Sequence, residues 1–126
     1  MHSKGLSLIE LLVSMLILSI LLLSIDAMQL RVMHEVQSSY YFGVAAQQIN
    51  NMIEHLHSSN EANPQSQINI WNQQNQQLLP QGSGEVRGSY PWFDIRIYWG
   101  KRNSDACEKM TIGKSGCLRT LTRTQI

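Results

Sequence analysis

The chain has 126 residues, 43% of them hydrophobic and 15% charged, with ten Lys and Arg against nine Asp and Glu for a formal net charge of +1. This length supports one small domain, and the near-neutral charge argues against a generally basic nucleic-acid binder. Two cysteines cannot build a four-thiolate zinc site, so we expect neither a metal nor another cofactor.

The first predicted element is an apolar segment over residues 6–25. Its 20 residues include a single charged side chain, Glu10. As a helix rising about 1.5 Å per residue, the segment covers about 30 Å, the thickness of one hydrocarbon core. Its serines are compatible with this, because a helical Ser hydroxyl can bond to its own backbone. The transmembrane residues we predict are Leu11, Leu12, Val13, Leu16, Ile17, Leu18, Ile20, Leu21, Leu22, Leu23 and Ile25.

The residues around this segment bear on its type and orientation. Lys4 is the only charge before it, so the positive-inside rule predicts a cytoplasmic N-terminus and a periplasmic or outer location for everything after Asp26. A secretory signal would need a small-residue cleavage site after the apolar run, and none follows here. A plain membrane anchor leaves Glu10 unexplained, because a carboxylate within a membrane costs about 2.5–3.5 kcal/mol on insertion scales.

The residues from Gly5 to Glu10 read Gly-Leu-Ser-Leu-Ile-Glu and precede the apolar run. This order resembles the class III signal of type IV prepilins and type II secretion pseudopilins, with Leu6 where Phe is commoner. The resemblance implies that a prepilin peptidase cuts between Gly5 and Leu6 and N-methylates Leu6. The new amine needs a counter-ion when helices pack out of water. We expect Glu10 to pair with it, in its own chain or in a neighbour, and pairing with a neighbour would set the axial register between subunits.

The helix is expected to continue beyond Asp26. No proline occurs between Ala27 and Leu56, and apolar residues recur there mostly three to four apart. We predict one helix from about Ser7 to Leu56, apolar all round in its first half and amphipathic in its second, which packs on its own domain. The residues expected to pack there, including three methionines read as core filling rather than a cofactor site, are Met28, Leu30, Met33, Tyr40, Tyr41, Phe42, Val44, Ile49, Met52, Ile53 and Leu56.

The polar stretch that ends at Pro64 terminates this helix. His55 and His57 lie two residues apart and so point to different faces of a helix, which argues against a metal site. Residues 65–81 are rich in Gln, and we predict a short second helix that buries Trp71 and Leu78. A disordered Gln/Asn tract is the alternative.

Three strands are predicted after the second helix. Residues 85–87 form a short strand, and residues 93–99 alternate, with Phe93, Ile95, Ile97 and Trp99 on one face. Residues 117–124 form a third strand near an edge. We predict an α+β fold in which a small antiparallel sheet lies on the amphipathic half of the helix. Tyr90 and Trp92, together with Phe93, are assigned to the core.

Cys107 and Cys117 enclose nine residues. In a periplasmic domain such a pair is expected to form a disulfide, which stabilises by about 2–3 kcal/mol in the chain-entropy model. Residues 96–126 carry seven Lys and Arg against two Asp and Glu. This basic end is open to three interpretations: a docking face for an acidic neighbour, a solvated surface, or a DNA-contacting patch.

The domain order that follows is a leader peptide at 1–5, a transmembrane and assembly helix at 6–25, and a periplasmic pilin-like headgroup at 26–126 that includes the amphipathic half of the helix. No nucleophile–base constellation, phosphate loop or metal-ligand spacing occurs, so we do not expect an enzyme. The chain resembles minor pilins of the PilV type in two features. One is the order of its elements: a long helix, Asn63-Pro64, a Trp-containing helix, Leu79-Pro80 and a Trp-ended strand. The other is the segment over residues 46–53.

This resemblance implies a role in starting pilus assembly, in support of pilus biogenesis, twitching motility or adhesion. The subunit would enter the fibre at low level, with the tip as one position. The implied partners are other minor pilins, the major pilin, prepilin peptidase and the inner-membrane assembly platform. We expect no small-molecule substrate and no nucleic acid. The implied location is the bacterial inner membrane and then the pilus. A GspI-type pseudopilin at a pseudopilus tip is the alternative, and a membrane-anchored periplasmic binding module is a third reading.

Overall fold

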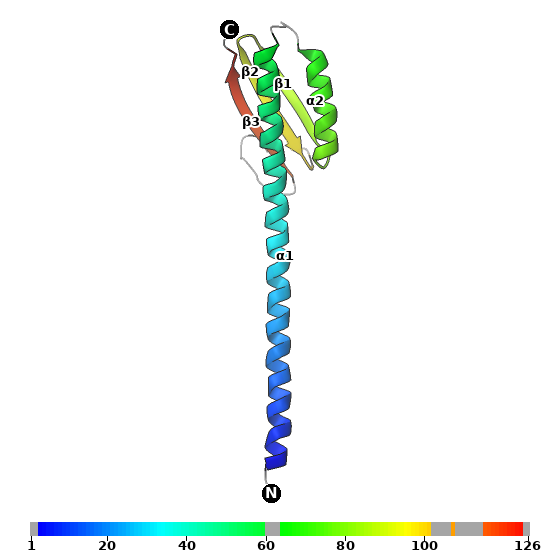
Figure 1. Cartoon of the computed structure of the whole chain (residues 1–126), viewed down its shortest axis with the longest axis vertical. Coiled ribbons are helices and arrows are strands. Elements are labelled where there is room, and N and C mark those ends of the chain that lie inside the picture. Colours follow the sequence, from blue (N-terminus) through cyan, green and yellow to red (C-terminus); the bar gives the residue numbers. More distant parts are fainter. Residues whose placement is uncertain (1–2, 60–63, 102–106, 108–114, 125–126) are drawn as a thin grey trace. The chain divides into compact units, whose positions relative to one another are not determined.

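The computed structural model describes residues 3–59, 64–101, 107 and 115–124, with side chains from residue 7 onward. Its elements are α1 (Ser3–Ser58), α2 (Gln65–Leu78), β1 (Ser83–Ser89), β2 (Trp92–Trp99) and β3 (Gly116–Arg123) (Figure 1). The strands form one antiparallel sheet in the order β1-β2-β3, so β3 lies at an edge as predicted. This is the predicted α+β fold, and its chain divides into two compact units, Met1–Val36 and Gln37–Ile126.

The long helix α1 runs without interruption for 56 residues, slightly beyond the predicted span at both ends. The absence of proline explains its continuity, since every interior N–H can bond to the carbonyl four residues earlier. At its end, the backbone N–H of Ser59 donates to the His55 carbonyl at 2.9 Å, and the Ser59 hydroxyl donates to the same oxygen at 2.6 Å. These bonds satisfy one of the carbonyls that a helix end leaves open.

The core of the second unit forms between one stripe of α1 and one face of β2. The α1 stripe is spaced four, three and four residues apart, which keeps it on one side of a helix. The β2 residues alternate as the sequence predicted, because successive strand side chains point to opposite faces. The buried core residues of these two elements are Ala45, Ile49, Met52 and Leu56 of α1 and Phe93, Ile95, Ile97 and Trp99 of β2.

Helix α2 joins this core through Trp71, which is 2% exposed. The Trp71 indole Nε1–H donates to the Gln48 carbonyl of α1 at 2.8 Å, and the Gly84 N–H of β1 donates to Oδ1 of Asn72 at 2.8 Å. Cζ3 and Cη2 of the Trp71 ring lie so close to β1 that only glycine fits at position 84. The prediction that α2 is a helix that buries Trp71 is therefore confirmed.

The prediction that Leu78 is buried is wrong. Leu78 is 46% exposed, whereas Leu79 is 2% exposed. The buried residues of α2 are Trp71 and Asn75, and the helix ends at Leu78, seven residues after Trp71. Leu79 adopts an extended conformation, with φ −119° and ψ 141°, and this change of direction brings the following residue into the core instead.

The predicted packing of the amphipathic half of α1 is only partly confirmed. The sheet is short: the eight residues of β2 span about 26 Å, and residues 41–56 of α1 span about 24 Å. The sheet therefore covers only the last turns of α1. Tyr41, Val44 and Ile53 pack against the core. The predicted packing residues that are instead exposed are Met28, Leu30, Met33, Tyr40 and Phe42.

The assignment of the aromatic cluster of Tyr90, Trp92 and Phe93 to the core is confirmed only for Phe93. Trp92 is 57% exposed because strand alternation places it on the face of β2 opposite Phe93. Tyr90, which is 53% exposed, lies in the turn between β1 and β2.

Candidate functional site

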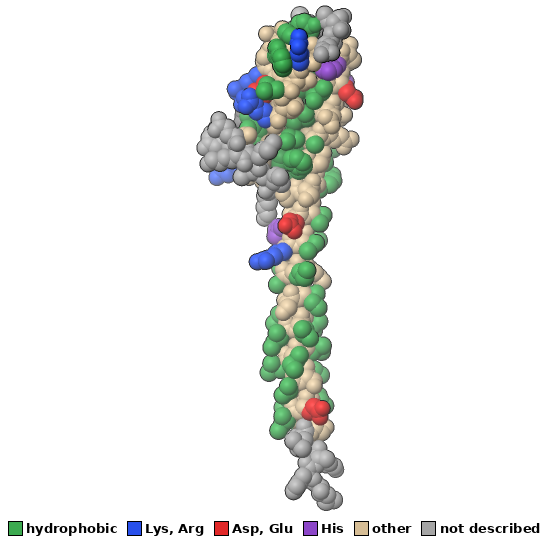
Figure 2. Space-filling model, turned by 90° about the vertical axis from the view of Figure 1, so that its left-hand side faces the viewer, with side chains coloured by type: hydrophobic (Ala, Val, Ile, Leu, Met, Phe, Trp, Pro, Cys, Tyr) green, Lys and Arg blue, Asp and Glu red, His purple; other side chains and the backbone are tan. Residues whose placement is uncertain are grey.

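The first unit presents hydrophobic side chains in every direction around α1. Each large hydrophobic residue from Leu8 to Ile25 is more than half exposed, and Figure 2 shows hydrophobic side chains covering this part of the helix. Within the described part of the chain, one helix is long and apolar enough to cross a membrane. A helix suits this environment because it satisfies its own backbone hydrogen bonds without water.

Three of the four serines in the apolar segment donate their hydroxyl groups to the backbone of the same helix. Ser14 donates to the Glu10 carbonyl at 2.7 Å, Ser19 to the Met15 carbonyl at 2.8 Å, and Ser24 to the Ile20 carbonyl at 2.9 Å. These bonds confirm the expected back-bonding, which lowers the cost of placing a hydroxyl in an apolar medium. The serines therefore leave the apolar character of the helix intact.

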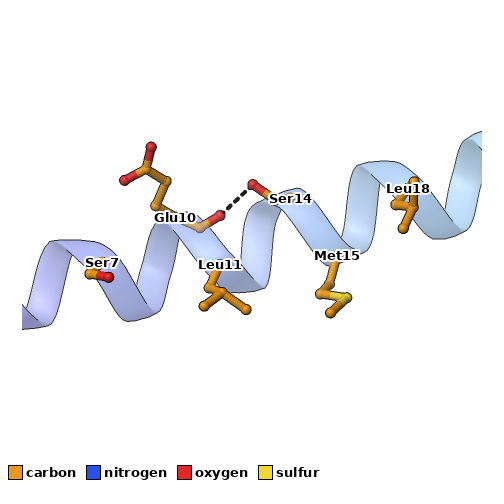
Figure 3. A pocket seen from close by; sticks show the side chains of 6 residues that line it. All are labelled: Ser7, Glu10, Leu11, Ser14, Met15 and Leu18. Atoms are coloured by element: carbon orange, nitrogen blue, oxygen red, sulfur yellow. Dashed lines mark hydrogen bonds between the residues drawn. The ribbon is translucent and has the colours of Figure 1, made fainter.

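Glu10 is the only charged residue in the apolar segment over residues 6–25. Its backbone carbonyl accepts the bond from Ser14, while its carboxylate points away from the helix and has no hydrogen bond or ion pair among the described side chains (Figure 3). Glu10 is one of the residues lining a shallow hollow on the helix surface, and two of the others are small serines. The residues lining the hollow are Ser7, Glu10, Leu11, Ser14, Met15 and Leu18.

The predicted processing site lies one turn before Glu10. The backbone of Gly5 and Leu6 belongs to α1, while the Leu6 side chain lies outside what the structure describes. Leu6 precedes Glu10 by four residues, so the two share one helix face about 6 Å apart along the axis. A helical side chain leans toward the N-terminus, which directs the Glu10 carboxylate toward the Leu6 turn.

The predicted disulfide is present. Cys107 and Cys117 are bonded, with their Cα atoms 4.8 Å apart, and Cys117 is 3% exposed at the start of β3. His55 and His57 are both exposed in the last turn of α1. Among the described residues, no group of three or more His, Cys, Asp or Glu side chains is placed to hold a metal ion.

A charged cluster on the sheet was not predicted from the sequence. Asp94 accepts bonds from Arg96 at 2.7 Å and from Arg119 at 2.9 Å. Partial burial alone would raise the pKa of Asp94, but the hydrogen bonds and charges of Arg96 and Arg119 outweigh it and hold this pKa below its ordinary value of 3.8. The bond to Asp94, with a further contribution from Tyr98, raises the pKa of Arg96.

The only signal for this cluster in the sequence is the placement of charged residues at alternate positions of two strands. Which residues face each other depends on the register, and the register pairs Arg96 with Arg119 and Asp94 with Leu121. Of the seven basic residues counted at this end of the chain, the structure describes Arg96, Lys101, Arg119 and Arg123. The other three, Arg102, Lys109 and Lys114, lie outside the described residues.

Comparison with known families agrees with the resemblance drawn from residues 5–10. The family model of the prokaryotic N-terminal methylation motif matches residues 1–25. Comparison with curated proteins and with solved structures returned no match. Members of this family assemble with other pilins after processing by prepilin peptidase, and the motif indicates a structural protein. Residues 1–25 therefore carry the methylation motif of type IV prepilins and pseudopilins, and the apolar helix and the α+β headgroup fit a membrane-anchored pilin.

Proposed function

We propose that the protein is a minor type IV pilin of the PilV type, which helps to start pilus assembly and enters the fibre at low level. The observation that carries the assembly role is the Glu10 carboxylate, which is exposed within the apolar segment and has no partner among the side chains described from residue 7 onward. An uncompensated charge in hydrocarbon costs several kcal/mol. Glu10 therefore favours a state in which a cation from a processed subunit lies beside it.

Processing supplies that cation. We propose that prepilin peptidase cleaves between Gly5 and Leu6, removing residues 1–5, and that N-methylation leaves a charged secondary amine at Leu6. Glu10 pairs with this amine in its own chain or in the next subunit. Pairing with the next subunit fixes the register of assembly, because only one axial offset between two helices then neutralises both charges. The apolar residues around it supply the contact area.

The proposed orientation places Lys4 in the cytoplasm and the headgroup in the periplasm. Lys4 supports this, because it is the only charge ahead of the apolar segment. The disulfide between Cys107 and Cys117 also supports it, since disulfides persist in the oxidising periplasm. The partners in this setting are the major pilin, the other minor pilins and the inner-membrane assembly platform.

Co-expression with prepilin peptidase tests the processing step. Intact-mass analysis is expected to show loss of the segment from Met1 to Gly5 and gain of one methyl group on Leu6. A catalytically inactive peptidase serves as the control and is expected to leave the chain whole. Retention of the leader with the active enzyme, or cleavage after Ile25, would contradict the proposal.

The counter-ion role is tested by replacing Glu10 with alanine in the native host. Glu10→Ala is expected to insert into the membrane normally but to be recovered poorly in sheared pili. Glu35→Ala is the matched control, since Glu35 is an exposed acid on the same helix that lies outside the predicted membrane segment. Equal recovery of the two variants would remove the basis for the counter-ion role.

Deletion of the gene decides between a pilus and a GspI-type pseudopilus: the proposal expects loss of twitching rather than loss of enzyme secretion.

A further inference from the structure

The outer face of the sheet, opposite the core, carries an apolar pair surrounded by arginines. Trp92 is 57% and Leu121 is 64% exposed. Trp92 pairs with Arg123 across β2 and β3, two residues from Leu121, so Trp92 and Leu121 are diagonal neighbours on one face. We call Arg87, Trp92, Arg119, Leu121 and Arg123 the Trp92 patch. In Figure 2, basic and hydrophobic side chains lie side by side on the headgroup.

The charge of this face is positive after its internal pairs are counted. It carries four arginines and two acids, which gives a formal net charge of +2. The acids are Glu85 and Asp94, and the arginines are Arg96 and the three in the patch. Arg87 bonds to Glu85 at 2.7 Å, and Arg119 shares Asp94 with Arg96. Arg123 has no carboxylate partner among the described residues, and its guanidinium carbon lies 5.6 Å from the centre of the Trp92 ring.

This composition is typical of protein interfaces. Trp and Arg are the residues most enriched at binding hot spots, and charged neighbours around an apolar centre exclude water from it. The arginines bonded to Glu85 and Asp94 are already held in place, so less side-chain entropy is lost when a partner binds. The side chains of Arg87 and Arg119 remain 57% and 44% exposed and are accessible to new acceptors.

We propose that the Trp92 patch docks an acidic protein surface of a neighbouring pilin subunit, with an apolar side chain of that subunit covering Trp92 and Leu121. Charge complementarity selects an acidic partner. The two carboxylates within the face disfavour the regular phosphate chain of a nucleic acid, and the exposed Leu121 suits an apolar protein contact. A second copy of this chain docked head to tail would extend into an open chain, which disagrees with incorporation at low level. The inference rests on the proposed function.

Binding of the full-length chain in detergent to each purified pilin subunit of the same cell tests the inference. One acidic subunit is expected to bind. Leu121→Ser and Arg123→Glu are each expected to weaken that binding at least about tenfold, and added salt is expected to weaken it further. Ile70→Ser and Lys101→Glu are the matched controls, because both residues are exposed outside the patch, and they are expected to bind as the unaltered chain does. Unchanged thermal unfolding establishes that the patch variants are folded.

Three outcomes would overturn the inference: no subunit whose binding depends on the patch, patch-dependent binding only to a second copy of this chain, or patch-dependent binding only to a 20-base-pair DNA duplex. A reversed charge on the partner that restores binding to Arg123→Glu would establish direct contact. Failure here is distinguishable from failure of the proposed function. Normal leader removal and Glu10-dependent incorporation with no effect of the patch would reject this inference alone. A retained leader would reject the proposed function, while the binding measurement still decides the patch.

Discussion

The contact between α2 and β1 leaves no room for a side chain at Gly84. A Cβ built there would lie 2.5 Å from Cη2 of Trp71 and 2.8 Å from Nδ2 of Asn75, and closer still to Cζ3 of Trp71. Real carbon contacts are about 3.5–4.0 Å, so the ring must move by about 1 Å or more. That movement also breaks the bond from Trp71 to the Gln48 carbonyl.

The magnitude follows from these contacts. Overpacking a tight core costs about 1–3 kcal/mol, and losing the Trp71 hydrogen bond adds about 1 kcal/mol. Replacing a strand glycine returns about 0.5–1 kcal/mol of backbone entropy. Gly84→Ala is therefore expected to lower the free energy of unfolding by about 1–3.5 kcal/mol, which for a headgroup of this size corresponds to a midpoint about 4–28 °C lower.

Urea unfolding of the full-length chain in detergent, followed by tryptophan fluorescence, measures this change. Gly43→Ala is the control, because nothing lies within 4 Å of a Cβ at that helical position. It is expected to stabilise by up to about 1 kcal/mol through helix propensity. Combining Gly84→Ala with Trp71→Leu tests the cause, since the two costs should not add if the clash is with the ring. Full additivity, or a Gly84→Ala chain as stable as the original, would refute the reasoning.

Three further changes probe other parts of the headgroup. Leu79→Ala is expected to cost about 2–4 kcal/mol because Leu79 is buried, while Leu78→Ala costs less than about 0.5 kcal/mol; equal urea midpoints for the two would contradict the observed end of α2. Reducing the Cys107–Cys117 disulfide is expected to cost about 2–3 kcal/mol, measured as a lower melting temperature with dithiothreitol, and a Cys117→Ser chain insensitive to dithiothreitol is its control. Asp94 has a lowered pKa, so its stabilisation is complete above its ordinary value of 3.8 and disappears as pH falls through the lower pKa of the folded state. Asp94→Asn is therefore expected to destabilise the headgroup by about 1 kcal/mol at neutral pH and to remove this part of the pH dependence of the free energy of unfolding. If that free energy changes in parallel with pH in the two chains, the bonding assigned to Asp94 is contradicted.

The sequence alone was sufficient for features that depend on residue type and local spacing. The apolar run, the position of Gly5 and Glu10 and the back-bonding serines all belong to one continuous helix, whose properties do not depend on distant contacts. The alternation in β2 and the approach of Cys107 to Cys117 are also local, because a strand has a period of two and a short loop keeps its ends close.

Only the tertiary structure decided which of several equally apolar residues are covered. Leu30 and Met52 are both apolar residues of α1, yet Leu30 is 63% exposed and Met52 is 0% exposed. Leu79 rather than Leu78 enters the core because the helix ends between them.

Local sequence patterns also did not determine which residues come together on the outer face of the sheet. The position of Trp92 and the bonds of Asp94 depend on which strand face meets α1 and on the register of β2 with β3. Both are settled by contacts between segments far apart in the chain. For that reason the membrane helix could be predicted from its own residues, while the Trp92 patch became visible only in the folded headgroup.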